Sequence, residues 1–187
     1  MAKFNFKEVI IKNLIIIEPK IINDERGYFF ESYNLLEFKD FGIDCDFVQE
    51  NQSKSKKGVL RGLHFQKRHS QGKLVRVLKG KIFDVAVDLR KDSQTFSKWF
   101  GIELSEYNKK QIFIPPNFAH GFLSLEDDTE IIYKCTDFYY PEYETGIIWN
   151  DDFLNINWPL SEIDKLIISE KDMNLPKFKS YINFFED

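Results

Sequence analysis

The sequence has little cysteine, and its cysteine is not arranged for a metal site or a disulfide framework. Its 187 residues include two cysteines, Cys45 and Cys135, which lie far apart and form no C-x-x-C pair. Thiolates that share a zinc ion normally come in closely spaced pairs, so a structural zinc site is not expected. We expect two reduced and mostly buried thiols.

Long apolar runs and an excess of basic residues are missing as well. The apolar run at residues 14–17 is too short for the core of a signal peptide or for a membrane span. The chain carries 26 Lys and Arg against 30 Asp and Glu, which gives a net charge of −4. Nucleic-acid binders usually show a basic excess. We therefore expect a cytoplasmic protein with no membrane or nucleic-acid partner.

Two familiar catalytic signatures are also absent. The chain contains no Gly-x-Ser-x-Gly, and neither cysteine has a catalytic context, so no side-chain nucleophile is expected. A metal-binding barrel of the cupin type typically carries an H-x-H pair on one strand, but the second residue after His64 is Gln66. His69 lies in a polar loop beside Lys67 and Arg68 and is expected to be solvated. We expect neither a metal nor another cofactor.

Aromatic residues, in contrast, are abundant, and they favour strands. They make up 16% of the chain, led by 19 Phe, and aromatic side chains suit a pleated, half-buried surface. Short apolar runs recur at close spacing and are broken by Gly, Pro, Asn and Asp, which indicates an all-β sandwich or barrel. With no internal repeat or low-complexity linker, residues 1–187 are expected to form one domain.

The predicted elements are mostly short strands. A hairpin is expected over residues 21–33, and a short helix over 34–41, with Asn34 as its N-cap and Gly42 at its end. Residues 161–175 are the other helix-tolerant stretch. Further strands are expected at residues 47–52, 60–66, 73–78, 81–89, 99–104, 111–114, 121–125 and 129–136.

Residues 58–90 hold the most informative pattern. The side-chain period of two puts His64 on one face of its strand with Gly62 and Gln66, and Lys73 on the face of two valines. Burying such groups unpaired is costly, so they are either satisfied structurally or functional. With a pKa near 6.5, His64 suits proton transfer at neutral pH. Asp172, in the S-E-K-D near the chain end, could orient the imidazole and stabilise its charged form. Without a nucleophile to activate, such a histidine is expected to move a proton to or from carbon.

Ordered motifs along nearly the whole chain resemble the dTDP-4-dehydrorhamnose 3,5-epimerase family. Many blocks in one order are far more specific than any single block. They are D-E-R-G-Y-F-F-E (24–31), F-V-Q-E-N-Q-S (47–53), G-V-L-R-G-L-H-F-Q (58–66), Q-G-K-L-V-R-V (71–77), D-V-A-V-D-L-R (84–90), Q-I-F-I-P-P-N-F-A-H-G-F (111–122), Y-K-C-T-D-F-Y (133–139), W-N-D (149–151) and S-E-K-D (169–172).

The resemblance implies a cupin-type jelly roll with a few short helices, no metal, and a homodimer with exchanged N-terminal strands. It implies that His64 is the catalytic base and Asp172 its partner. Tyr133 matches the acid that returns a proton from the opposite face. Lys73 matches the cation beside the O4 atom of the sugar, where a fixed ammonium would stabilise an enolate.

The resemblance also implies the residues that hold a nucleotide-diphospho-sugar. Guanidinium and other cationic groups suit its diphosphate, polar groups its base and ribose, and an aromatic ring its base. The implied set, in chain order, is Arg26, Glu31, Gln49, Glu50, Asn51, Arg61, His120, Tyr139, Glu144 and Lys171.

The sequence thus predicts a metal-independent 3,5-epimerase in surface or capsular polysaccharide biosynthesis. It would convert dTDP-4-dehydro-6-deoxyglucose to dTDP-4-dehydrorhamnose through proton exchange at C3 and C5. The same chemistry on a GDP-linked 4-keto-6-deoxyheptose, or at C3 alone, is the alternative. A ketoisomerase and a catalytically silent sugar-binding jelly roll are more remote.

Overall fold

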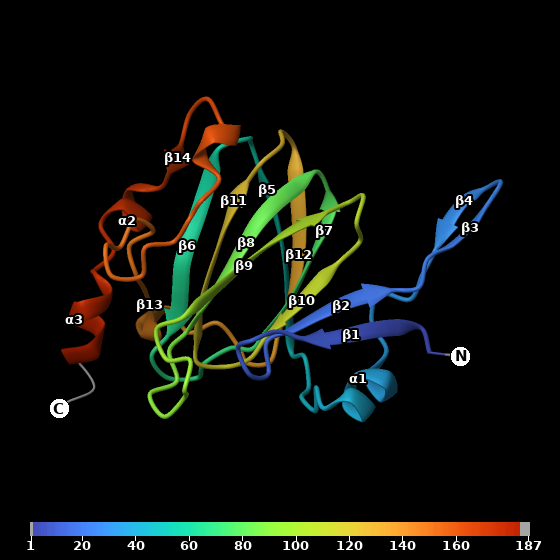
Figure 1. Ribbon diagram of the computed structural model, residues 1–187, viewed down its shortest axis with the longest axis horizontal. Helices are drawn as coiled ribbons and strands as arrows, with labels where there is room; N and C mark the ends of the chain where they lie inside the picture. The colour runs from blue at the N-terminus through green and yellow to red at the C-terminus, as the bar shows by residue number, and fades with distance from the viewer. Residues whose placement is uncertain (1, 184–187) are drawn as a thin grey trace.

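The computed structural model describes residues 2–183 and contains two six-stranded sheets that face each other (Figure 1). One sheet has the order β1-β2-β10-β7-β12-β5, and the other has the order β13-β6-β11-β8-β9 with β14 parallel to β6. The strands are β1 (Phe4–Glu8), β2 (Ile15–Pro19), β3 (Ile22–Asp24), β4 (Gly27–Phe29), β5 (Gln49–Ser55), β6 (Val59–Gln66), β7 (Lys73–Lys79), β8 (Lys81–Asp88), β9 (Trp99–Ser105), β10 (Gln111–Ile114), β11 (Phe118–Ser124), β12 (Thr129–Cys135), β13 (Glu144–Gly146) and β14 (Ile167–Ile168).

Helices are few and short, as expected. They are α1 (Leu35–Phe41), α2 (Glu170–Met173) and α3 (Phe178–Asn183), with 3-10 turns at Pro141–Tyr143 and Leu160–Glu162. The predicted all-β jelly-roll sandwich is therefore confirmed. None of the helices within residues 2–183 is long and apolar enough to cross a bilayer.

Three apolar clusters hold these layers together. The first fills the space between the two sheets, with Val75 and Ile112 from one sheet and Ala86 and Phe122 from the other. The second covers the outer face of β6, β8 and β11 with residues of the C-terminal segment, including Trp158 and Phe178. The third covers the other sheet with α1 through Phe38. The cluster between the sheets is interrupted by the polar residues of the site.

Most local predictions hold. The helix begins after Asn34, whose side chain accepts from two backbone amides, and ends at Gly42 in the left-handed conformation. The hairpin forms as β3 and β4. The strand expected at 47–52 lies slightly later, at Gln49–Ser55. Of the helix-tolerant residues 161–175, only Glu170–Met173 form an α-helix, because β14 pairs with β6 just before them.

The predicted alternation is correct on β8 and wrong on β6. Leu60 and Leu63 both lie in the cluster outside β6, whereas Arg61 and His64 both line the cavity between the sheets. The register against β11 shifts at this point, which is a β-bulge. The bulge falls at Gly62, where φ is +121° and an added Cβ would lie 2.4 Å from a backbone atom of β11. Glycine is therefore required there.

Candidate active site

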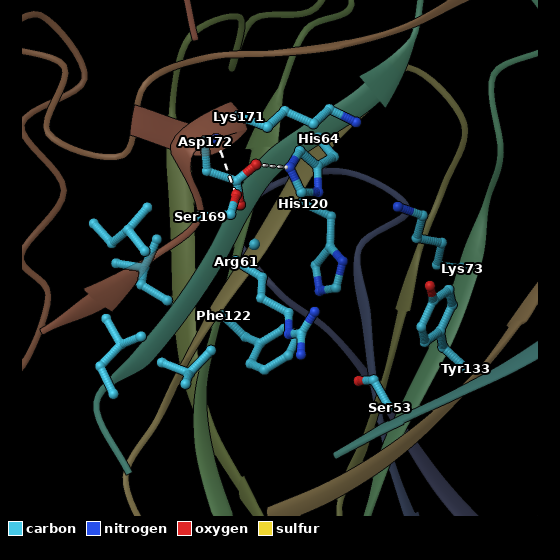
Figure 2. Close-up of a pocket in the computed structure, with 15 residues that line it drawn as sticks. Ser53, Arg61, His64, Lys73, His120, Phe122, Tyr133, Ser169, Lys171 and Asp172 are labelled. Atoms are coloured by element: carbon cyan, nitrogen blue, oxygen red, sulfur yellow. Dashed lines mark hydrogen bonds and ion pairs between the residues drawn. The ribbon is translucent and has the colours of Figure 1, made fainter. Parts of the chain in front are cut away.

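A cavity of about 550 Å³ opens between the two sheets (Figure 2). Its walls come from β5, β6, β7, β11 and β12, and residues 167–172 close one side. Seven residues predicted from the sequence line it: Arg61, His64, Lys73, His120, Tyr133, Lys171 and Asp172. The folding of the sheets brings together groups that lie far apart in the sequence.

His64 and Asp172 form a hydrogen-bonded pair. The Nε2 atom of His64 lies 2.7 Å from Oδ1 of Asp172, while Oδ2 accepts the amide of Gly62 at 3.2 Å. Burial alone would raise the pKa of Asp172, but the hydrogen bond and charge of His64 outweigh burial and lower that pKa. The carboxylate thus stays ionised and holds the proton on Nε2, which leaves Nδ1 of the neutral ring as the basic nitrogen.

A short helix places Asp172 at this point. Ser169 is the N-cap of α2, and its hydroxyl accepts the amide of Asp172 at 3.1 Å. The cap therefore fixes the backbone whose side chain binds His64.

Lys73 and Tyr133 face this pair from the opposite sheet (Figure 2). The ammonium of Lys73 lies 5.9 Å from the centroid of the Tyr133 ring. Desolvation lowers the pKa of Lys73 and raises the pKa of Tyr133. The phenol therefore stays protonated at neutral pH and can donate a proton, and the ammonium is a poorly hydrated cation.

A second histidine–carboxylate pair lies in the floor of the cavity. The Nε2 atom of His120 lies 2.8 Å from Oδ2 of Asp84, a fully buried carboxylate. The other oxygen of Asp84 has no hydrogen-bond partner among the described residues. Sequence reasoning missed Asp84, although a signal was present, because it interrupts an apolar face of β8 between Ile82 and Ala86.

Arg61 enters the cavity because of the β-bulge and is braced by β5. Its Nε donates to Oγ of Ser55 and one terminal nitrogen donates to the carbonyl of Lys54, each at 3.3 Å. These bonds use two of the five N–H groups of a guanidinium and leave three for an anionic ligand. Ser53 and Phe122 also line the cavity and were not predicted. Ser53 follows Asn51 at the strand period of two, which was the available signal.

Four predicted residues form a polar group at the edge of the cavity, here called the rim cluster: Gln49, Tyr139, Glu144 and Lys171. The phenol of Tyr139 donates to Glu144 at 2.6 Å, and Lys171 also binds this carboxylate. Burial would raise the pKa of Glu144, but these two bonds lower it, and the same carboxylate raises the pKa of Tyr139 to about 12. Gln49 accepts the amide of Tyr139 at 2.9 Å and donates to Asn51 at 3.1 Å.

The structure does not bring three predicted residues to this cavity. Arg26 sits at the tip of the β3–β4 hairpin, which projects from the body (Figure 1), and pairs with Asp24 at 2.5 Å. Glu31, at the base of that hairpin, binds Lys3 and the side chain of Asn34. Glu50 points to the opposite face of β5 from Asn51, since neighbouring strand residues face opposite ways, and pairs with a lysine of β12 at 2.5 Å.

No three His, Cys, Asp or Glu residues within residues 2–183 are grouped so that they could hold a metal ion. His69 lies outside the cavity, with Nδ1 3.3 Å from a carboxylate oxygen of Asp137. The site therefore consists of an oriented imidazole, a facing phenol and ammonium, and several cationic side chains. Such a set can remove a proton from carbon, stabilise the resulting anion and return a proton from the other side.

Comparison with known proteins agrees with a site that moves protons at carbon. The family model described as dTDP-4-dehydrorhamnose 3,5-epimerase matches residues 8–180. The dTDP-4-dehydrorhamnose 3,5-epimerase of Methanothermobacter thermautotrophicus is 55% identical over 174 residues, covering 93% of this chain and 94% of that protein. The enzyme of the same name from Salmonella typhimurium is 52% identical, covering 89% and 91%.

Solved structures show the same fold. The dTDP-6-deoxy-D-glucose-3,5-epimerase of Legionella pneumophila, in complex with dTDP-4-keto-L-rhamnose, superposes with a TM-score of 0.91 at 48% identity, covering 94% of this chain and 93% of that one. The epimerase of Mycobacterium tuberculosis superposes with a TM-score of 0.92 at 36% identity, covering 97% and 92%.

Proposed function

Because this chain belongs to the dTDP-4-dehydrorhamnose 3,5-epimerase family, we propose that its cavity inverts C3 and C5 of dTDP-4-dehydro-6-deoxyglucose. The chain is an isomerase that acts on nucleotide sugars. One observation carries the assignment of roles, which is that His64 and Tyr133 enter the same cavity from opposing sheets. Inversion at carbon requires removal of a proton on one face and its return on the other.

The first step is removal of a carbon-bound proton by His64. The C4 ketone acidifies the hydrogens at C3 and C5. Nδ1 of the imidazole takes one of them, while Asp172 stabilises the imidazolium that forms, 2.7 Å from Nε2. The electron pair moves into the ring as an enolate, and negative charge gathers on O4.

Lys73 is placed to stabilise that enolate. Its ammonium is desolvated in the cavity, and a fixed charge in such a place acts more strongly on a developing oxyanion than the same charge in water. Tyr133 then donates its phenolic proton to the opposite face of the carbon. The imidazolium then releases its proton to solvent and the phenolate takes one up from solvent, after which repetition of the cycle at the other carbon gives the doubly inverted product.

The cations and the rim cluster would hold the nucleotide. Arg61 offers three N–H groups to the diphosphate. Lys171 lines the same cavity and pairs with Glu144 of the rim cluster. Tyr139 is half exposed and presents a ring on which a base can stack. Holding the non-reacting part of the substrate positions the sugar between base and acid.

We propose that the protein forms a homodimer in which the β3–β4 hairpin reaches the cavity of the second copy. The hairpin exposes Ile22, Tyr28 and Phe29, which is unfavourable for an isolated two-stranded ribbon in water. Arg26 lies at its tip, outside its own cavity. Exchange of hairpins would bury this apolar surface and bring a cation to the partner's diphosphate.

Incubation in deuterated water with a panel of dTDP-, GDP- and CDP-linked 4-keto-6-deoxy sugars, followed by NMR, tests the function. We expect deuterium at C3 and C5 of the dTDP-linked hexose. Preference for a GDP-linked heptose would change the substrate, and exchange at C3 alone would change the product. Movement of the carbonyl would indicate a ketoisomerase. Binding of sugars without exchange would reject catalysis.

His64→Asn supplies the matching variant, since asparagine keeps a polar side chain and cannot act as a base. Exchange should fall by at least about a thousandfold, toward the loss typical of an essential base, while the melting temperature and dTDP affinity stay close to the wild type. Full exchange in this variant would refute the role of His64.

A further inference from the structure

One buried side chain ties together the two loops behind the rim cluster. Gln66 is 6% exposed, and its Nε2 donates to the carbonyl of His69 at 2.6 Å and to that of Phe138 at 3.2 Å. Its Oε1 accepts the amide of Tyr140 at 2.7 Å. Both hydrogens of the amide and its oxygen are therefore in use.

These bonds fix the backbone on both sides of Tyr139. Gln66 binds the residue before it and the residue after it, and Gln49 binds the amide of Tyr139 itself at 2.9 Å. Further along, Gln66 lies opposite Glu144 in the pairing of β6 with β13. Gln66 thus contributes to the placement of both Tyr139 and Glu144, which are hydrogen-bonded to each other.

An aromatic layer lies against this junction. The His69 ring lies 4.4 Å from the Tyr140 ring and 5.6 Å from the Tyr143 ring, measured between centroids. Arg68 lies over Tyr143 at 5.9 Å, and Nδ1 of His69 faces Asp137. The loop at residues 67–70 and the aromatic segment at residues 140–143 therefore pack on each other. Their contacts hold the two loops at the spacing that the Gln66 amide bridges.

We infer that Gln66 is a positioning residue for the nucleotide end of the site, an inference that rests on the proposed function. It is two residues from His64 on β6 but lies outside the cavity lining. It acts through the placement of Tyr139 and Glu144. Its loss should weaken nucleotide binding and leave proton transfer at saturating substrate largely intact.

Gln66→Met tests the inference, because methionine is of similar size and makes none of the three bonds. We expect the Kd for dTDP, measured by titration calorimetry, to rise about tenfold. The saturated exchange rate should stay within about twofold, so that the change appears in KM rather than kcat. In a Tyr139→Ala background the same substitution should change the Kd clearly less, since only the part of its effect that passes through Glu144 remains.

Gln66→Glu separates positioning from folding. A carboxylate still accepts the Tyr140 amide but cannot donate to the two carbonyls, whereas a protonated carboxyl donates to one of them. The dTDP affinity of this variant should therefore improve as pH falls, relative to the wild type at the same pH. Gln52→Glu makes the same change at an exposed position of β5, where Gln52 binds Glu130, and should show no such improvement.

Several outcomes would overturn the inference. They are wild-type dTDP affinity in folded Gln66→Met or Gln66→Glu, a full additional loss in the Tyr139→Ala background, and a fall in kcat with unchanged KM. If methionine prevents folding, the pH response of Gln66→Glu decides. Failure of the wild type to bind dTDP would instead reject the proposed nucleotide, so the two failures are distinguishable.

Discussion

His64 and Asp172 are 108 positions apart in the chain, yet their side chains meet at 2.7 Å. Their residue types were enough to propose the pair, because an imidazole that moves a proton needs a partner on its far nitrogen. Asp84 shows where this reasoning stops. A buried aspartate on an apolar strand face is visible in the sequence, but its partner His120 becomes evident only when β8 and β11 lie side by side.

The desolvated charge of Lys73 should lower the stability of the fold while it supports activity. Its pKa is lowered from 10.5 in the folded state by burial. Between the folded and the unfolded pKa, the unfolded chain binds more protons, so the free energy of unfolding rises with pH in that window. Below the folded pKa, the folded protein carries the full cost of the poorly hydrated ammonium.

Lys73→Met should therefore stabilise the protein at pH 7 and abolish exchange. We expect a melting temperature higher by about 2–4 °C, which corresponds to about 1 kcal/mol for a chain of this size, and a flatter alkaline stability profile. Lys79→Met, at an exposed position of the same strand, is the control and should change neither. A less stable Lys73→Met protein would contradict this account.

At the scale of elements, α2 consists of only four residues, and Ser169 caps it. Ser169→Ala should cost about 1 kcal/mol of stability and let Asp172 move away from His64. Because small misplacements at a catalytic group are costly, exchange should fall about tenfold. Differential calorimetry and the deuterium assay measure the two effects. Ser180→Ala, in α3, should leave the exchange rate unchanged, and equal losses in both variants would argue against the cap.

The bulge in β6 gives a second prediction at this scale. In Gly62→Ala the new Cβ would lie 2.4 Å from the Cα of Gly121 with φ at +121°, so we expect a loss of about 2–4 kcal/mol in urea unfolding. Gly27→Ala has a similar φ, +126°, but open space around the Cβ. Gly27→Ala therefore has the backbone strain without the clash, and it should lose clearly less free energy of unfolding than Gly62→Ala.

The same bulge explains the main error in predicting the elements. The composition and spacing located the β3–β4 hairpin and strands β5 to β12, because alternating apolar residues follow the pleat, but not the short strands β13 and β14. Alternation put Arg61 and His64 on opposite faces, but the structure has both in the cavity. A shift of one residue reverses every side chain beyond it. The only sequence signal for that shift was Gly62, which has many other possible meanings.

For the whole molecule, exchange of hairpins makes a specific prediction for mixtures. Arg26→Ala should weaken dTDP binding about tenfold or more, as expected for a lost charged contact to phosphate. Mixed with His64→Asn after unfolding and refolding together, it should recover up to about a quarter of the wild-type activity. Half of the dimers are then mixed, and each has one site with both residues intact.

If Arg26 serves its own cavity, every site in the mixture lacks one of the two residues and no activity returns. The wild type refolded in the same way is the control. The hairpin itself was predictable from its turn residues 24–27. Its outward direction (Figure 1) was not, because turn residues specify a hairpin and not its orientation on the body. That residues 1–187 form one domain also stays a prediction.

The β-bulge also makes β6 a strand of fixed length. Arg61 is braced on β5, and His64 is tied to α2, so both ends of the interval between them are anchored to different parts of the protein. Inserting one residue within 61–64 while the bulge is kept would turn one of the two side chains out of the cavity. Such an insertion would separate substrate binding from chemistry, and Gly62 itself has no room for a side chain.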